Sequence, residues 1–151
     1  MKRISIFLIF VLAVSVVAKA QKQIVILHTN DTHSTIEPVS KYSKVKEAAG
    51  KAGCVRRATM VKQLREQNPD ILLFDSGDFS QGSPFYTMYK GDVEAGLMTI
   101  MGYDAATIGN HEFDFGLDNL ARLARQAKFP IVCSNCDFTG TPCQDVIKKY
   151  C

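Results

Sequence analysis

Four short apolar runs, separated by stretches with a helical repeat, constrain the fold of this chain more than any other feature. The runs cover residues 24–29, 71–75, 105–109 and 129–135. They are rich in branched side chains and lack polar alternation, which is typical of strands covered on both faces. Their alternation with helices predicts an α/β fold of mainly parallel strands, joined by right-handed crossovers, with helices on the faces.

The predicted helices occupy the stretches between these runs, where apolar residues return with a helical period. We expect them near residues 55–67, 93–101 and 117–128. Pro69 prevents the first helix from continuing. Asp92 is placed to cap the second helix and Gly102 to end it.

The first twenty residues have the pattern of an export signal. Lys2 and Arg3 precede an apolar run, and small residues stand at 18 and 20. We therefore predict a signal peptide over residues 1–20 and a mature chain over 21–151, in the periplasm or outside the cell. The apolar run is shorter than the ~20 residues of a membrane-spanning helix. A stable membrane anchor is not expected, although an uncleaved anchor is the alternative.

Charge and cysteine content exclude some functions. Three of the 18 basic residues lie in the predicted signal, which leaves 15 against 15 acidic residues, so no basic surface predicts binding to a nucleic acid polymer. Five cysteines are an odd number, so at least one is free or pairs elsewhere. Cys133 and Cys136 have the spacing of a zinc or redox pair, but no second pair completes a tetrahedral site. A buried thiol or a local disulfide is the simpler interpretation.

Polar side chains follow each predicted strand at the point where it ends. They are Asp31 and His33, then Asp78, then Asn110, His111, Glu112 and Asp114, and finally Asn135. The carboxyl ends of parallel strands meet at one edge of a sheet, where ligands of open α/β sheets bind. We therefore expect a shared site. The alternative is that polar residues simply populate loops, and that Asp114 caps the following helix.

The predicted donors suit divalent metal ions. Carboxylate and amide oxygens with an imidazole favour ions such as Zn, Mn or Fe. Asp78 could bridge two ions about 4 Å apart, and such a pair binds a phosphate ester and activates water. His111 could then donate a proton to a phosphoryl oxygen or a leaving group, held by Asp114. Glu112 receives no assigned role.

Three motifs in this order resemble one known family. "ILHTNDTH", "DSGDFSQG" and "YDAATIGNHEFDFG" are similar to the calcineurin-like metallophosphoesterases, in the secreted branch of 5′-nucleotidases, UDP-sugar hydrolases and cyclic-nucleotide phosphodiesterases. The resemblance covers residues 24–140. It implies two divalent metal ions and a nucleotide or other phosphate ester as substrate. It also implies metal ligands at Asp31, His33, Asp78 and Asn110, with a catalytic pair at His111 and Asp114.

The chain departs from the family in its later ligands. The family supplies two further histidines and a polar ligand from later strands, whereas this sequence has only His28, His33 and His111. We expect His28 to be a packed core residue. The sequence therefore predicts the amino-terminal part of a hydrolase, an incomplete half of a layered α/β domain that is poorly active alone. The alternatives are a module that binds an ion or phosphate without chemistry, and a purely structural relic.

Overall fold

The computed structural model describes residues 23–150, which form an α/β fold around one parallel sheet. The five strands pair in sequence order, β1 to β5, and every pairing is parallel. They are β1 (Ile26–Thr29), β2 (Leu72–Asp75), β3 (Ala105–Ala106), β4 (Ile131–Val132) and β5 (Ile147–Lys148). The predicted parallel α/β fold is confirmed. The two-residue strand β5 was not predicted.

All three predicted helices are present, together with two short helices that the sequence pattern did not predict. The helices are α2 (Cys54–Gln67), α3 (Pro84–Tyr89), α4 (Asp92–Met101), the 3₁₀ helix η1 (His111–Phe113) and α5 (Gly116–Gln126). The serine before α3 explains its position, because the Ser83 hydroxyl accepts hydrogen bonds from the backbone N–H groups of Phe85 and Tyr86. Proline in the first helical turn also favours this start.

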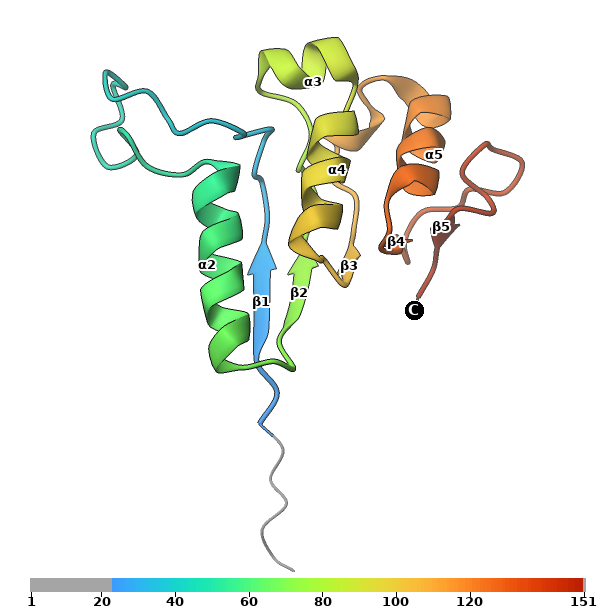
Figure 1. The fold of residues 1–151 in the computed structure, drawn as a ribbon. Helices are drawn as coiled ribbons and strands as arrows, with labels where there is room; N and C mark the ends of the chain where they lie inside the picture. The colour runs from blue at the N-terminus through green and yellow to red at the C-terminus, as the bar shows by residue number, and fades with distance from the viewer. Residues whose placement is uncertain (1–22, 151) are drawn as a thin grey trace, which may run out of the picture.

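Helices α2, α4 and α5 form a layer over one face of the sheet (Figure 1), and α4 packs against both neighbours. Strands that are added in sequence order by right-handed crossovers place every connecting helix on the same side. The core lies between this layer and the sheet, where Leu73, Ala106 and Ile131 meet Met98 and Leu120. It fixes the strand ends that carry the polar loops.

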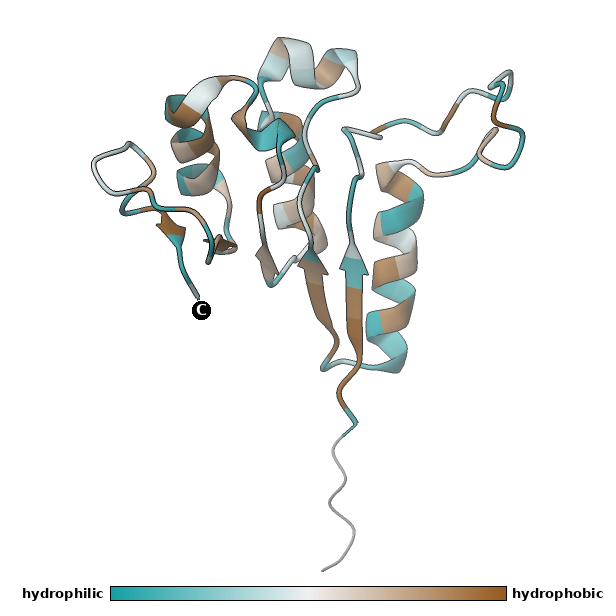
Figure 2. Cartoon of the chain, turned by 180° about the vertical axis from the view of Figure 1, so that it is seen from behind, coloured by the Kyte–Doolittle hydropathy of each residue, from teal (hydrophilic) through white to brown (hydrophobic). Residues whose placement is uncertain are grey.

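The opposite face of the sheet carries no helix among the described residues, as the rear view shows (Figure 2). Ile26 is 57% exposed and Leu72 is 37% exposed. The prediction that the apolar runs are covered on both faces is therefore wrong for β1, whose side chains alternate between exposed and half-buried positions. The prediction of a packed core position for His28 is also wrong, because His28 is exposed on the same side as Ile26.

The ends of α4 agree only in part with the sequence. Gly102 ends the helix in a left-handed conformation with φ 71°, as predicted. Asp92 does not cap the helix, because Gly91 occupies the capping position and no side chain there accepts a backbone hydrogen bond. Asp92 lies in the first turn instead, where it forms an ion pair with Arg122 of α5. Asp92 thus links α4 to α5 and does not cap α4.

The described cysteines are free thiols, and Cys54, Cys133 and Cys143 are buried. They pack as small apolar side chains, which agrees with the simpler of the two interpretations. Cys151 and the predicted signal peptide lie outside the described residues. Within residues 23–150, no helix has the length and apolar character that a membrane crossing requires.

Candidate metal centre

The loops that follow β1 and β2 run side by side at the carboxyl edge of the sheet. The backbone N–H of Asp31 donates to the Gly77 carbonyl, and that of His33 donates to the Asp78 carbonyl, each at 3.0 Å. These bonds extend the parallel pairing of the strands into the loops. The topology therefore brings two segments that are more than forty residues apart into direct contact.

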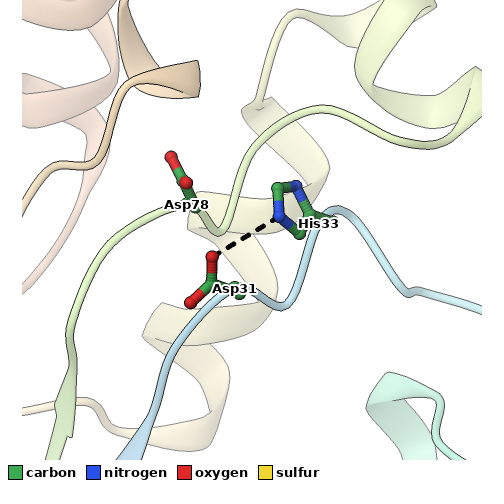
Figure 3. Close-up of side chains that lie close together, drawn as sticks. All are labelled: Asp31, His33 and Asp78. Carbon is green, nitrogen blue, oxygen red and sulfur yellow. Dashed lines mark ion pairs between the residues drawn. The ribbon is translucent and has the colours of Figure 1, made fainter.

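This contact gathers three of the predicted ligands. Asp31, His33 and Asp78 each offer one ligand atom, and the three atoms lie within 4.8 Å of one another. The Nε2 atom of His33 lies 3.6 Å from Oδ1 of Asp31. Figure 3 shows the three side chains together, with Asp31 and His33 on one loop and Asp78 on the other. The arrangement has the size and donor types of a site for a divalent cation.

The backbone at these residues adopts an uncommon conformation. The φ angles are 49° at Asp31, 42° at His33 and 53° at Asp78. Residues other than glycine rarely occupy this left-handed region, and such conformations persist where the surrounding structure enforces them. Their concentration at three neighbouring polar residues indicates that the loops are shaped to present these side chains.

The charges of the cluster also fit a cation. Among the described residues, the ion pairs include none between a lysine or arginine and either Asp31 or Asp78. The Nδ1 atom of His33 is buried and has no hydrogen-bond partner there. The other ring nitrogen, Nε2, faces Asp31. Two adjacent carboxylates with no cationic side chain, together with this nitrogen, form a donor set that suits a divalent ion.

The turn after β3 meets this cluster through Asp78. The backbone N–H of His111 donates to Oδ1 of Asp78 at 3.0 Å. Gly109 permits this close approach, because a Cβ atom there would lie 2.1 Å from the same oxygen. Asn110 stands between these two residues and its side chain is exposed. The turn thus brings the backbone that flanks Asn110 to the carboxylate that was predicted to be shared.

His111 and Asp114 form a hydrogen-bonded pair beside the cluster. Nδ1 of His111 lies 2.9 Å from Oδ2 of Asp114, and the rings of His111 and His33 are 5.2 Å apart. The hydrogen bond to Asp114 raises the pKa of His111, since a nearby carboxylate favours the imidazolium. The alternative role of Asp114 as a helix cap is not adopted, because α5 begins without a side-chain cap.

Tyr86 of α3 supports the same turn. Its hydroxyl donates to the His111 carbonyl at 3.0 Å. Burial raises the pKa of Tyr86 to about 12, so the phenol keeps its proton and remains a donor at neutral pH. The unpredicted helix α3 therefore contributes to the position of His111.

Two buried carboxylates near the loops had no predicted role. Glu112 is fully buried, and it accepts hydrogen bonds from backbone N–H groups of both the β2 loop and the β3 turn. Asp75 accepts from the Gly77 N–H at 2.9 Å and from the Thr29 hydroxyl at 2.5 Å. Burial raises the pKa of Asp75. The three-residue spacing from Gly109 to Glu112, similar to that of a capping box, is the sequence signal that could have identified Glu112.

Asn135, which follows β4, does not belong to the gathered cluster. It is exposed, and its side-chain oxygen accepts a hydrogen bond from the Cys133 thiol at 3.3 Å. It lines a separate depression with Asp75, Thr107 and Val132. The contacts of Asn135 are thus with Cys133 and this depression.

A profile of one family matches nearly the whole described chain. The family, described as calcineurin-like phosphoesterase, matches residues 24–149. The chain is 40% identical over 131 residues to a 5′-nucleotidase of Homo sapiens, an alignment that covers 85% of this chain and 23% of the relative. It is 41% identical over 121 residues to a snake venom 5′-nucleotidase of Gloydius brevicauda, covering 79% and 21% of the two chains.

Solved structures agree with this match. The 5′-nucleotidase precursor from Thermus thermophilus superimposes with a TM-score of 0.75 at 30% identity, covering 85% of this chain and 25% of that one. The calcineurin-like phosphoesterase YfkN from Bacillus subtilis gives a TM-score of 0.63 at 33% identity, covering 84% and 40%. The chain spans about a quarter or less of the curated 5′-nucleotidases described above.

Proposed function

This chain belongs to the calcineurin-like phosphoesterase family. We propose that it acts as a metal-dependent phosphoric-ester hydrolase on nucleotides. The observation that carries the proposal is the gathering of Asp31, His33 and Asp78 ligand atoms within 4.8 Å of one another. A common ligand accounts for the convergence of residues from two loops in strained conformations. The remaining roles follow from what lies around this cluster.

We assign two ion positions that share Asp78. Asp31, His33 and Asp78 would hold the first ion, and Asp78 with Asn110 would hold the second. A pair of Zn, Mn or similar ions would supply Lewis-acid chemistry there: polarisation of a phosphoryl group and a lower pKa for a water that attacks phosphorus. The residues themselves bind and orient. Asp78 is suited to the shared role because one of its oxygens already accepts the His111 N–H, which fixes the carboxylate between the two loops.

His111 would act as the proton donor of the site. Asp114 engages Nδ1, so that this nitrogen carries a proton and Nε2 is left to face a phosphoryl oxygen or the leaving group. The raised pKa keeps more of the imidazole protonated near neutral pH. Asp114 would orient the ring and support its charge without touching substrate.

The nucleotide assignment and the location of the protein rest on the relatives and on the first twenty residues. The relatives described above include 5′-nucleotidases from Homo sapiens and from Gloydius brevicauda. This supports a nucleoside monophosphate as the substrate class. The basic, apolar and small-residue order of residues 1–20 supports export, as expected for a signal peptide.

A second function is favoured by the number of ligands in this chain. The sequence contains three histidines, and His28 is exposed on the helix-free face. The second ion would then have only Asp78 and Asn110 as protein ligands, which is fewer than the three of a typical catalytic zinc. The segment could hold one ion, or an ion and phosphate, without turnover.

The experiment that separates the two functions measures binding and turnover on the same sample. Phosphate release from AMP and from p-nitrophenyl phosphate is measured with added Mn²⁺ or Zn²⁺, alongside the number of ions bound by each chain. Metal-dependent release that disappears in Asp78→Asn supports the hydrolase. One bound ion with no release supports the binding module. A chain that binds no ion in a folded state overturns both.

A further inference from the structure

Glu112 is a fully buried carboxylate with an unusual set of partners. Its Oε2 accepts from the backbone N–H of Asp78 at 2.9 Å and of Gly109 at 2.6 Å. Its Oε1 accepts from the N–H of Ser80 at 3.0 Å. No lysine or arginine among the described residues forms an ion pair with it. The buried charge is therefore supported by backbone donors, which form strong charge-assisted hydrogen bonds.

These three bonds join two separate segments. Asp78 and Ser80 lie in the loop after β2, whereas Gly109 lies in the turn after β3. The two segments share no backbone-to-backbone hydrogen bond among the described residues beyond the end of the strand pairing. The other bond between them is from the His111 N–H to Oδ1 of Asp78. Carboxylate side chains thus connect the segments where the backbone does not.

The two segments also touch closely at glycines. A Cβ atom at Gly77 would lie 2.5 Å from the Gly109 nitrogen, and one at Gly109 would lie 2.1 Å from Oδ1 of Asp78. Because the two segments approach so closely at these glycines, a small shift of either segment changes the contacts between them. A connection that fixes the separation therefore fixes the distance between Asp78 and Asn110.

We propose that Glu112 is a positioning residue that sets the separation of the Asp78 loop from the Asn110 turn, and with it the affinity of the second ion position. This inference rests on the proposed function, because the second position is defined there. Glu112 touches neither substrate nor ion. It acts through the backbone of residues that do, and outer supports of this kind change metal affinity by about 10- to 100-fold.

The first test compares two variants with the wild type by calorimetric titration of Mn²⁺. Glu112→Gln replaces one oxygen with an amide group that cannot accept from an N–H. Glu112→Asp keeps the charge but shortens the reach, so that it can serve only one segment. We expect either variant to weaken the second ion by about 10- to 100-fold. The first ion should be weakened by a smaller factor, because its two loops are also joined by backbone hydrogen bonds.

Asp104→Asn is the matched control. Its carboxylate also accepts a backbone N–H, that of Leu73 at 2.7 Å, but at the opposite end of the strands. A purely structural role for Glu112 predicts that all three variants lower the unfolding temperature and leave both ion affinities at the wild-type value. That result in folded Glu112→Gln and Glu112→Asp overturns the proposal.

A measurement on the wild type keeps the test decisive if the variants do not fold. Hydrogen exchange should be slow at the amides of Asp78, Ser80 and Gly109 in the metal-free protein, because each donates to Glu112. Exchange as fast as in an exposed loop overturns the proposal. If the wild type binds no ion at all, the proposed function fails instead, and the exchange rates still show whether Glu112 joins the two segments.

Discussion

The two sides of the candidate metal centre meet at Asp78 but are built differently. On one side, the loop that carries Asp31 and His33 is joined to the Asp78 loop by backbone hydrogen bonds. On the other side, the turn that carries Asn110 is joined to the same loop by the carboxylates of Asp78 and Glu112. Backbone bonds persist through most substitutions, whereas a carboxylate bond disappears with its side chain.

The sides also differ in what they offer an ion. The first position has two carboxylates and an imidazole, while the second has the shared carboxylate and a neutral amide. The first side should therefore bind more tightly and tolerate changes around it, and the second should be weaker and more sensitive. Substitutions on each side, and at the residue they share, test that contrast.

Asp78→Asn should have the largest effect, because it changes the residue common to both sides. Asn keeps one oxygen that can accept the His111 N–H, but it loses the negative charge and the second oxygen that a shared ligand needs. We expect the affinity for both ions to fall by more than about 100-fold, beyond the usual effect of an outer support. Metal content after dialysis against Mn²⁺ measures this, with Asp104→Asn as control. If the variant retained two ions, Asp78 would not be the shared ligand.

His111→Gln should have the next largest effect, but on turnover alone. Positioned proton donors contribute about 10²- to 10⁴-fold to rate, and the side chain of His111 is not among the assigned ligands. We expect that loss in the hydrolysis of p-nitrophenyl phosphate, with both ions retained. His28→Gln, on the helix-free face, should match the wild type. If His111→Gln lost metal together with activity, His111 would be a metal ligand, and the ligand set assigned to the second side would be wrong.

His33→Ala and Asn110→Ala form a reciprocal pair that tests the contrast directly. His33→Ala should weaken the first ion, and Asn110→Ala the second, each by at least the roughly 10- to 100-fold that loss of an outer support causes. Calorimetric titration with Mn²⁺ resolves the two, and each variant is the control for the other. Equal loss of both ions in either variant would mean that the positions are not separable.

The gathering of the side chains on the first side follows from topology, which the sequence pattern predicts. Apolar runs identify parallel strands, and parallel strands deliver Asp31 and Asp78 to the same edge. The sequence-based prediction was wrong for His28, whose burial depends on which face of the sheet the helices cover. His28 has the sequence context of an interior residue of β1, yet strand order places every described connecting helix on the other side of the sheet.

Glu112, which supports the second side, received no predicted role for a related reason. The bond from the Gly109 N–H to Glu112 has a local spacing, but the other two donors are more than thirty residues away in the chain, and no local pattern gives that distance. Helix α3 was missed because six residues are too few for an apolar period to be recognised, although Ser83 and Pro84 mark its start. Strand β5 has two residues and exists through its pairing with β4. Local sequence specifies elements better than it specifies their long-range polar contacts.

Asp75→Asn should have the smallest effect on metal, and it is the sharpest control for Glu112→Gln. Asp75 is also a buried carboxylate that accepts a loop N–H, that of Gly77, but it lies on the side joined by backbone bonds. We expect less than about a threefold change in either ion affinity. A loss as large as that of Glu112→Gln would show that any buried carboxylate near the loops has this effect, and the contrast between the sides would fail.

The same variant should change how stability depends on pH. Burial raises the pKa of Asp75 above its value of 3.8 in an unfolded chain. The folded state then holds the proton to higher pH than the unfolded state, so this group makes unfolding easier as pH rises from about 4 through the folded pKa. Asn has no such proton. Relative to the wild type, Asp75→Asn should therefore gain stability as pH rises through that window, measured by urea unfolding at a series of pH values. A constant difference across the window would mean that Asp75 titrates normally, and that the Thr29 and Gly77 donors offset its burial.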